Sequence, residues 1–255
     1  MTDPVALRKA APKIFGSGTT SDGGAAQGDP NSKTLLFCCA GEAAPSYFED
    51  IDSKTFAQLA EINQLGCIYT VQAFLPFISR GTISLCSSVA GQIGVFGFTA
   101  YSPTKFALRG FAECLHMELC DRNINIQVAY PPDTDTPGFE RENKIKPRET
   151  ALISETAALY KPLEIGRRML QSASSSNPPF NVYFDFDGFL VSTLCSGFAP
   201  VTTLLDALAQ VSCTSIVRWV ALFYLQYWYS IVRKCRLERG ADTAEKKKGG
   251  GKKQD

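Results

Sequence analysis

The chain has 255 residues, of which 45% are hydrophobic and 20% are charged, a composition typical of a globular domain. Its 26 basic and 25 acidic side chains leave a net charge of +1, which does not favour nucleic acid as a partner. The nine cysteines are odd in number and form no Cys-x-x-Cys pair, and the single histidine is His116. We therefore expect neither a disulfide framework nor a metal site, and we expect a reducing compartment.

Residues 1–33 are rich in Gly, Ala, Ser, Thr, Asp and Pro, and they contain no apolar stretch of the kind found in secretory signals. This composition predicts a flexible leader. The apolar run at residues 34–39, which ends at Ala40-Gly41, predicts a buried strand followed by a tight turn.

Strand and helix patterns then alternate along the chain. We expect a strand over 34–39, a helix over 53–80, a strand over 82–86, a helix over 102–119 and a strand over 124–130. This alternation is typical of βαβ units, and right-handed crossovers would place the strands in one parallel sheet. The predicted fold is α/β, a partial Rossmann-like doubly wound sheet over residues 34–183. Ligands of such sheets bind beyond the carboxyl ends of the strands.

The character of the sequence changes near residue 184. Residues 189–205 and 214–232 are strongly apolar, and the second stretch is rich in Trp and Tyr and contains one charge, Arg218. Nineteen such residues approach the length that spans a hydrocarbon core. We expect a helical, membrane-associated region over 184–236; the alternative is a buried amphipathic helix that extends the fold. Residues 237–255 are lysine-rich and predict a disordered basic tail.

The residues best suited to chemistry are Ser88, Tyr101 and Lys105. Ser88 follows a predicted strand, and Tyr101 and Lys105 lie four residues apart at the start of the next helix, on one helical face. A nearby ammonium lowers the pKa of a phenol, so this pair can act as an acid and base. The Ser88 hydroxyl can hydrogen-bond the same substrate oxygen.

These residues carry a resemblance to a known family. Residues 83–111 (ISLCSSVAGQIGVFGFTAYSPTKFALRGF) resemble the active-site segment of the short-chain dehydrogenase/reductase family. Within that family, residues 128–139 (VAYPPDTDTPGF) are most similar to the enzymes of sphingolipid synthesis that reduce 3-ketodihydrosphingosine, with Pro131-Pro132 where the wider family has Pro-Gly. The resemblance extends from Leu35 to Arg236.

The resemblance implies a role for each matching residue. Tyr101 would protonate the ketone oxygen, Lys105 would lower the pKa of Tyr101 and bind the ribose of the cofactor, and Ser88 would orient the ketone. Asn63 would hold a water in a proton relay to the lysine. The implied cofactor contacts are Tyr101, Lys105, Ala40, Gly41, Pro131, Pro132 and Thr136.

The implied activity is NADPH-dependent reduction of 3-ketodihydrosphingosine to dihydrosphingosine. The substrate would be a long-chain keto-sphingoid base, and residues 189–232 would contact the membrane surface or the bilayer. The resemblance places such an enzyme at the endoplasmic reticulum membrane with its active site facing the cytosol. It also implies a homo-oligomer paired through helices 53–80 and 102–119.

Two features depart from the family. Cys38-Cys39 precedes Ala40-Gly41 where the family has an asparagine, and a thiol cannot make the hydrogen bonds of an amide. The glycine-rich phosphate loop is not found in residues 1–33, where Gly16-Ser17-Gly18 and Gly23-Gly24 lack the strand and helix that should surround it.

The missing loop predicts an N-terminally truncated family member with an exposed sheet edge and with weak binding of NADPH or none. A truncated gene model would give the same sequence. Two further alternatives are a non-catalytic remnant that serves as an interaction protein, and a reductase of another lipid or steroid ketone.

Overall fold

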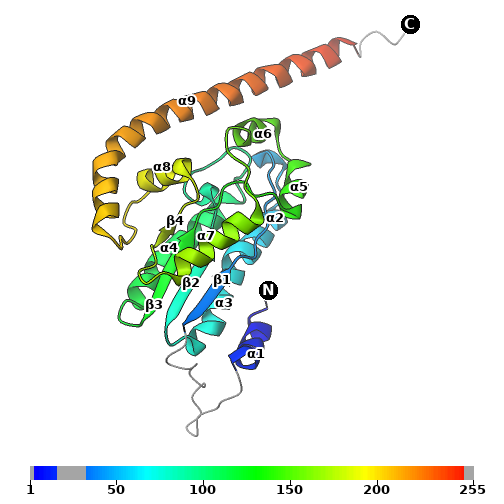
Figure 1. Cartoon of the computed structure of the whole chain (residues 1–255). Coiled ribbons are helices and arrows are strands. Elements are labelled where there is room, and N and C mark those ends of the chain that lie inside the picture. Colours follow the sequence, from blue (N-terminus) through cyan, green and yellow to red (C-terminus); the bar gives the residue numbers. More distant parts are fainter. Residues whose placement is uncertain (1–2, 16–32, 250–255) are drawn as a thin grey trace.

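The computed structural model describes residues 3–15 and 33–249, with side chains as far as residue 241. Its centre is a parallel four-stranded sheet in the order β1-β2-β3-β4, and β1 is an edge strand of this described sheet, as predicted (Figure 1). The strands are β1 (Thr34–Cys38), β2 (Gly81–Cys86), β3 (Ile124–Ala129) and β4 (Asn181–Val182). The predicted α/β architecture is therefore confirmed.

Helices cover both faces of the sheet, and the alternation along β2 shows how. Ile83 and Leu85 are fully buried against α3 (Gly66–Phe74) and α4 (Ser102–Glu118). Thr82 and Ser84 point to the other face, where the Thr82 hydroxyl donates to a carbonyl of α7 (Pro162–Ser174) at 2.9 Å. Because successive side chains of a strand point to opposite faces, one apolar and one hydrogen-bonded face result.

The predicted helix over 53–80 is one continuous rod with a local irregularity. It consists of α2 (Ser53–Leu59), a π-helical turn η2 (Ala60–Leu65) and α3, and it ends in the short 3-10 turn η3 (Leu75–Phe77). The turn η2 widens the backbone at Asn63, a fully buried residue. Single π-helical turns inside α-helices occur often at functional sites.

Two predicted irregular segments differ in the structure. Pro4–Phe15 forms helix α1 instead of a flexible leader, because its Ala-rich face buries Ala11 completely against α3, where Arg8 also contacts Gln72. The predicted disordered tail begins as helix, since α9 (Leu204–Gly249) continues through a segment rich in helix-favouring Ala, Glu and Lys. The rest of both segments, 1–2, 16–32 and 250–255, lies outside the described residues.

The C-terminal region is helical, as predicted, and it arches over the carboxyl ends of the strands (Figure 1). Helix α8 (Phe186–Leu194) packs against α9, which continues over α6 (Arg148–Ser154). Trp228, Ile231 and Cys235 of α9 pack against Ile153 and its neighbours. Beyond them, Arg239 forms an ion pair with the fully buried Glu149, so α9 is anchored to the α/β unit.

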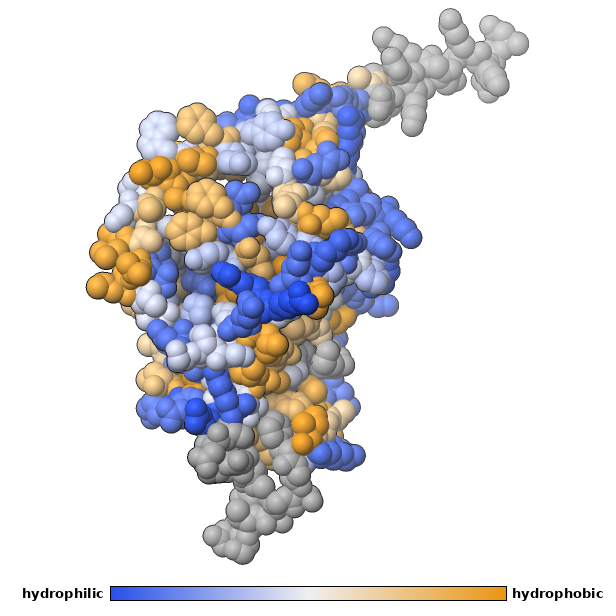
Figure 2. Space-filling view, in the orientation of Figure 1, coloured by the Kyte–Doolittle hydropathy of each residue, from blue (hydrophilic) through white to orange (hydrophobic). Residues whose placement is uncertain are grey.

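In the described part of the chain, one helix is long and apolar enough to cross a membrane, namely α9 over Leu204–Ala241. Its most apolar window has a mean hydropathy of 1.4, and only 6% of that window is buried. Figure 2 shows apolar side chains gathered on the left of the molecule, over the region where Figure 1 draws α8 and the first half of α9. The exposed apolar residues of this half include Leu204, Leu205, Val211, Ile216, Trp219 and Phe223.

Candidate active site

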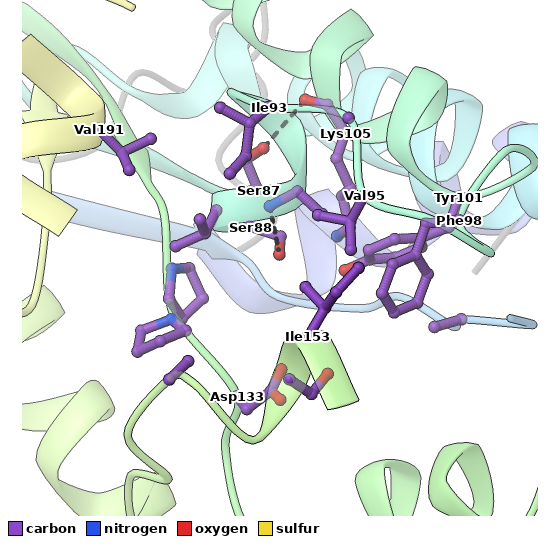
Figure 3. A pocket seen from close by; sticks show the side chains of 18 of the residues that line it. Ser87, Ser88, Ile93, Val95, Phe98, Tyr101, Lys105, Asp133, Ile153 and Val191 are labelled. Atoms are coloured by element: carbon purple, nitrogen blue, oxygen red, sulfur yellow. Dashed lines mark hydrogen bonds between the residues drawn. The ribbon is translucent and has the colours of Figure 1, made fainter. Parts of the chain in front are cut away.

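A cavity of about 810 Å³ opens beyond the carboxyl ends of β1, β2 and β3. Ser88, Tyr101 and Lys105 all line it, and Figure 3 shows their side chains grouped on one wall. The structure thus brings the three predicted catalytic residues together where an open parallel sheet binds its ligands.

The strand ends hold Ser88 in place. The backbone N–H of Ser87 donates to Ala129 at 2.8 Å, and that of Val89 donates to Pro131 at 3.3 Å, so the ends of β2 and β3 stay side by side. Ser88 itself is extended, and its hydroxyl accepts a hydrogen bond from the N–H of Ala90 at 3.2 Å. This contact fixes the direction of the hydroxyl oxygen at the cavity wall.

Helix α4 presents the other two residues. Tyr101 precedes its first turn, and Lys105 follows one turn later with 4% of its surface exposed. The Lys105 ammonium donates to the carbonyl of Cys86 at 3.0 Å and lies 5.6 Å from the centre of the Tyr101 ring. The Ser87 hydroxyl donates to the backbone carbonyl of Lys105 at 2.9 Å, which ties the helix start to the end of β2.

The electrostatics of Tyr101 differ from the simple expectation. Burial raises the pKa of the phenol above its ordinary value, and the positive charge of Lys105 and a hydrogen bond with Ser88 oppose this rise only in part. The lysine acts in the predicted direction, but desolvation is the larger effect. Tyr101 is therefore protonated at neutral pH, as a proton donor must be.

Asn63 does not line the cavity but lies directly behind it. Its side chain accepts from the N–H of Glu42 at 2.8 Å and donates to the carbonyl of the same residue at 2.9 Å. It also donates to the Thr104 hydroxyl on α4 at 3.0 Å. Asn63 thus holds the turn after β1 against α4, and its proposed role in a water relay stays a prediction.

The turn after β1 brings the backbone close to the lysine. A Cβ atom at Gly41 would lie 3.1 Å from the Lys105 ammonium and 3.2 Å from the Asn63 amide oxygen. A side chain at this position would therefore displace Lys105 or Asn63. The glycine is required here for close approach, and it leaves an open floor in the cavity.

The two cysteines that replace the expected asparagine occupy different faces. Cys38 is buried in the core with Cys67, whereas Cys39 lines the cavity beside Cys86. A hydrogen bond from Cys39 and the charge of Lys105 lower the pKa of Cys86 to about 7. The backbone hydrogen bonds expected of the missing asparagine are not made by a thiol; the amide of Asn63 supplies two such bonds to this turn.

Most of the predicted cofactor contacts line the cavity. Gly41, Pro131, Pro132 and Thr136 do so, and the Thr136 hydroxyl also caps α5 (Pro137–Asn143) by accepting from Phe139 at 3.1 Å. Ala40, the remaining predicted contact, is not among the residues that line the cavity.

The far wall of the cavity could not be foreseen from sequence. Helix α8 contributes Leu190, Val191 and Leu194, and α9 contributes one helical face with the spacing of an amphipathic helix. The α9 residues that line the cavity are Val217, Arg218, Val220, Ala221, Tyr224, Leu225 and Trp228. The apolarity of residues 214–232 was recognisable, but its use as a cavity wall depends on how α9 folds back over the strands.

Comparison with known proteins supports the resemblance. The sequence profile described as short chain dehydrogenase matches residues 33–146. The chain is 44% identical over 216 residues to 3-ketodihydrosphingosine reductase of Bos taurus. The aligned region covers 83% of this chain and 64% of the relative. The chain is 45% identical over 208 residues to 3-dehydrosphinganine reductase of Danio rerio, and that aligned region covers 80% of this chain and 62% of the relative. The chain therefore spans slightly less than two thirds of the length of these relatives.

Solved structures show the same fold. The structure described as ElxO with NADP bound superposes with a TM-score of 0.57 at 20% identity, covering 69% of each chain. A short chain dehydrogenase from Burkholderia cenocepacia in complex with NADP gives 0.58 at 16% identity, covering 77% of this chain and 74% of that one. With its parallel sheet, its matching sequence profile and its 44–45% identity to the two reductases, the chain is similar to the short-chain dehydrogenase family and shares its fold.

Proposed function

We propose that this protein acts in the NADPH-dependent reduction of 3-ketodihydrosphingosine to dihydrosphingosine. The observation that carries the proposal is a single cavity with Ser88, Tyr101 and Lys105 on one wall and the apolar faces of α8 and α9 on the other. The wall with Ser88, Tyr101 and Lys105 suits reduction of a ketone, and the apolar wall suits binding of a long alkyl chain. The 3-ketodihydrosphingosine reductase of Bos taurus and the 3-dehydrosphinganine reductase of Danio rerio are 44–45% identical to the chain over the aligned residues.

Ser88, Tyr101 and Lys105 have different roles in the reaction of the carbonyl group. The Ser88 hydroxyl donates a hydrogen bond to the ketone oxygen and orients it toward Tyr101. Tyr101, whose raised pKa keeps it protonated, donates its proton to the same oxygen as negative charge develops there. Lys105 then stabilises the resulting phenolate, because the two groups lie close together with little solvent between them.

The nicotinamide end of a cofactor fits the residues that are described. Gly41 leaves the floor beside Lys105 open, since a Cβ atom there would nearly touch the ammonium. Lys105 and Tyr101 would bind the ribose, and Pro131, Pro132 and Thr136 would border the ring. When bound, a reduced nicotinamide would supply the hydride of the reduction, that is, the hydrogen on carbon together with two electrons. None of the described residues before β1 reaches the cavity, and Gly16-Ser17-Gly18 lies outside the described residues.

The C-terminal helices suit a substrate that partitions into membranes. Val217 and Trp228 on the inner face of α9 line the cavity, whereas Trp219 and Phe223 on its outer face are about two-thirds exposed. A helix that is apolar on both sides can contact a bilayer outward and an alkyl chain inward. We infer that α9 lies against the membrane of the endoplasmic reticulum, with the cavity on the cytosolic side.

Pairing of subunits through the helices of residues 53–77 and through α4 also belongs to this proposal. It is supported by the apolar residues that α4 leaves exposed, Phe106 at 42% and Met117 at 69% of their surface. Sedimentation of the purified chain in detergent would measure the assembly directly.

The activity is tested with the full chain in detergent micelles, by following oxidation of NADPH and the mass of the sphingoid product. We expect turnover that falls at least about 100-fold in Tyr101→Phe, because a positioned acid contributes this much or more. Tyr229→Phe is the matched control, since Tyr229 lies on α9 outside the cavity and is 46% exposed.

Three outcomes would contradict the proposal in different ways. Equal background rates in the chain and in Tyr101→Phe would favour a non-catalytic interaction protein. Reduction of a steroid ketone in preference to 3-ketodihydrosphingosine would favour a different carbonyl reductase. Failure to bind NADPH in a fluorescence titration would show that the chain lacks an essential part of the cofactor site.

A further inference from the structure

The double-proline segment contains an aspartate that the catalytic roles leave unused. Asp133 follows Pro131-Pro132 at the carboxyl end of β3 and lines the catalytic cavity. The N–H of Val89 donates to Pro131, and the N–H of Tyr160 donates to the Asp133 carbonyl at 2.9 Å, so the backbone is held on both sides. In Figure 3 the carboxylate lies on the cavity wall opposite Ser88 and Tyr101.

The two aspartates of this segment have different surroundings. Asp135 lies at the surface and forms a close ion pair with Lys161, at 2.6 Å. Asp133 has a more distant cation, the Lys146 ammonium at 3.9 Å, and this lysine lies closer to Glu142, at 3.0 Å. Asp135 therefore has a structural partner of its own, whereas Asp133 shares one lysine with a second carboxylate.

The charged groups on this side of the cavity are paired unevenly. Asp133 and Glu142 both line the cavity, and the single lysine between them has only 2% of its side chain exposed. Arg141 and Arg218 also border the cavity from exposed positions, but neither forms one of the ion pairs found among the described residues with these carboxylates. Asp133 thus lacks a close ion-pair partner of its own, and a cation bound in the cavity could supply one.

Burial also disfavours the charged form of Asp133. It raises the pKa of Asp133, and Lys146 and the Ser154 hydroxyl counter that effect only in part. A partly desolvated carboxylate gains most from a cation that binds next to it. The apolar faces of α8 and α9 meanwhile provide no competing charge except Asp187 and Arg218.

We propose that Asp133 binds the ammonium group of an amino-ketone substrate and so determines specificity for sphingoid bases over ketones that lack the amine. The proposal rests on the proposed function, because the substrate named for the relatives carries an amine on the carbon next to its ketone. With the ketone oxygen held by Ser88 and Tyr101, the amine must lie beside it, and the carboxylate across the cavity is the acceptor for its N–H groups.

The first test compares two substrates of equal chain length, 3-ketodihydrosphingosine and 1-hydroxyoctadecan-3-one, which lacks the amine. For Asp133→Asn we expect kcat/KM to fall roughly 10- to 100-fold with the amino ketone and less than about threefold with the other, as for loss of one charged hydrogen bond. Asp135→Asn is the matched control and should change neither value. Equal losses with both substrates, or no loss with either, would overturn the proposal.

The second test needs no turnover. Trp228 lines the cavity, so its fluorescence should report binding of the product dihydrosphingosine and of octadecane-1,3-diol, which lacks the amine. The unmodified chain should bind the amine more tightly, Asp133→Asn should lose this preference, and Asp133→Glu should retain part of it. Equal affinity of the unmodified chain for both ligands would refute the role of Asp133. If this preference is present without any reduction of the ketone, the proposed function fails alone.

Discussion

Replacement of Lys105 by methionine tests whether the charge of the lysine helps Tyr101 to donate its proton. The Lys105 ammonium lies 5.6 Å from the centre of the Tyr101 ring, and the lysine is 4% exposed. At an effective dielectric constant of about 20, two unit charges at this distance attract one another by about 3 kcal/mol. Loss of this attraction would raise the pKa of the phenol further and would destabilise the developing phenolate by about the same energy.

For Lys105→Met we therefore expect kcat to fall about 100-fold. The rate should be measured at saturating NADPH and ketone, so that weaker binding of the cofactor does not contribute. Lys105→Arg is the control that keeps the charge, although its bulkier head should fit less well beside Gly41, where the lysine is already close to the backbone. Thermal unfolding of both variants would show whether loss of the hydrogen bond to the Cys86 carbonyl affects the fold.

One result would refute this reasoning. If Lys105→Met retained kcat within about threefold while Tyr101→Phe were inactive, the phenol would donate its proton without electrostatic help from the lysine. Lys105 would then serve only to bind the ribose or to support the end of β2.

Three further predictions concern the packing, the membrane face and the titration. Gly91→Ala should destabilise the fold by about 1–3 kcal/mol in chemical denaturation, because its Cβ would lie 2.3 Å from the Ser87 hydroxyl; an unchanged midpoint would contradict this packing. The double change Trp219→Asp with Phe223→Asp should abolish flotation with liposomes while leaving the circular dichroism of the chain unchanged, and continued flotation would show that the outer face of α9 is not the contact. Because burial raises the pKa of Tyr101 above its ordinary value, an ultraviolet difference titration against Tyr101→Phe should show the phenolate of this residue only at higher pH than that of a free tyrosine; a phenolate near pH 7 would refute the balance of effects.

The local elements of this fold could be predicted because they depend on short-range patterns. The run before Ala40 and the run before Ser88 are apolar and bounded by turn residues, and both are strands. Tyr101 and Lys105 lie four residues apart, which already places them on one face of a helix. The family resemblance rests on the same short segments, so it needed no knowledge of contacts between distant parts of the chain.

Segments whose structure depends on contacts with distant parts of the chain were predicted less well. The composition of Pro4–Phe15 does not reveal that α3 will cover Ala11. Packing of one face against another element stabilises a helix beyond the helix propensity of its residues. The roles of Asn63 and Glu149 have the same origin. Each is a common polar residue in sequence, and each becomes fully buried because distant groups complete its hydrogen bonds.

The amino-acid sequence by itself determined the strand and helix order, the three proposed catalytic residues and the apolar character of the C-terminal region, because periodicity and spacing act over a few residues. Tertiary structure alone decided that α9 folds back to line the cavity, that Asp133 faces that cavity while Asp135 pairs with Lys161, and that Tyr101 stays protonated. These outcomes depend on burial and on charges brought together from distant parts of the chain, and the free energy of a charge depends on everything that surrounds it.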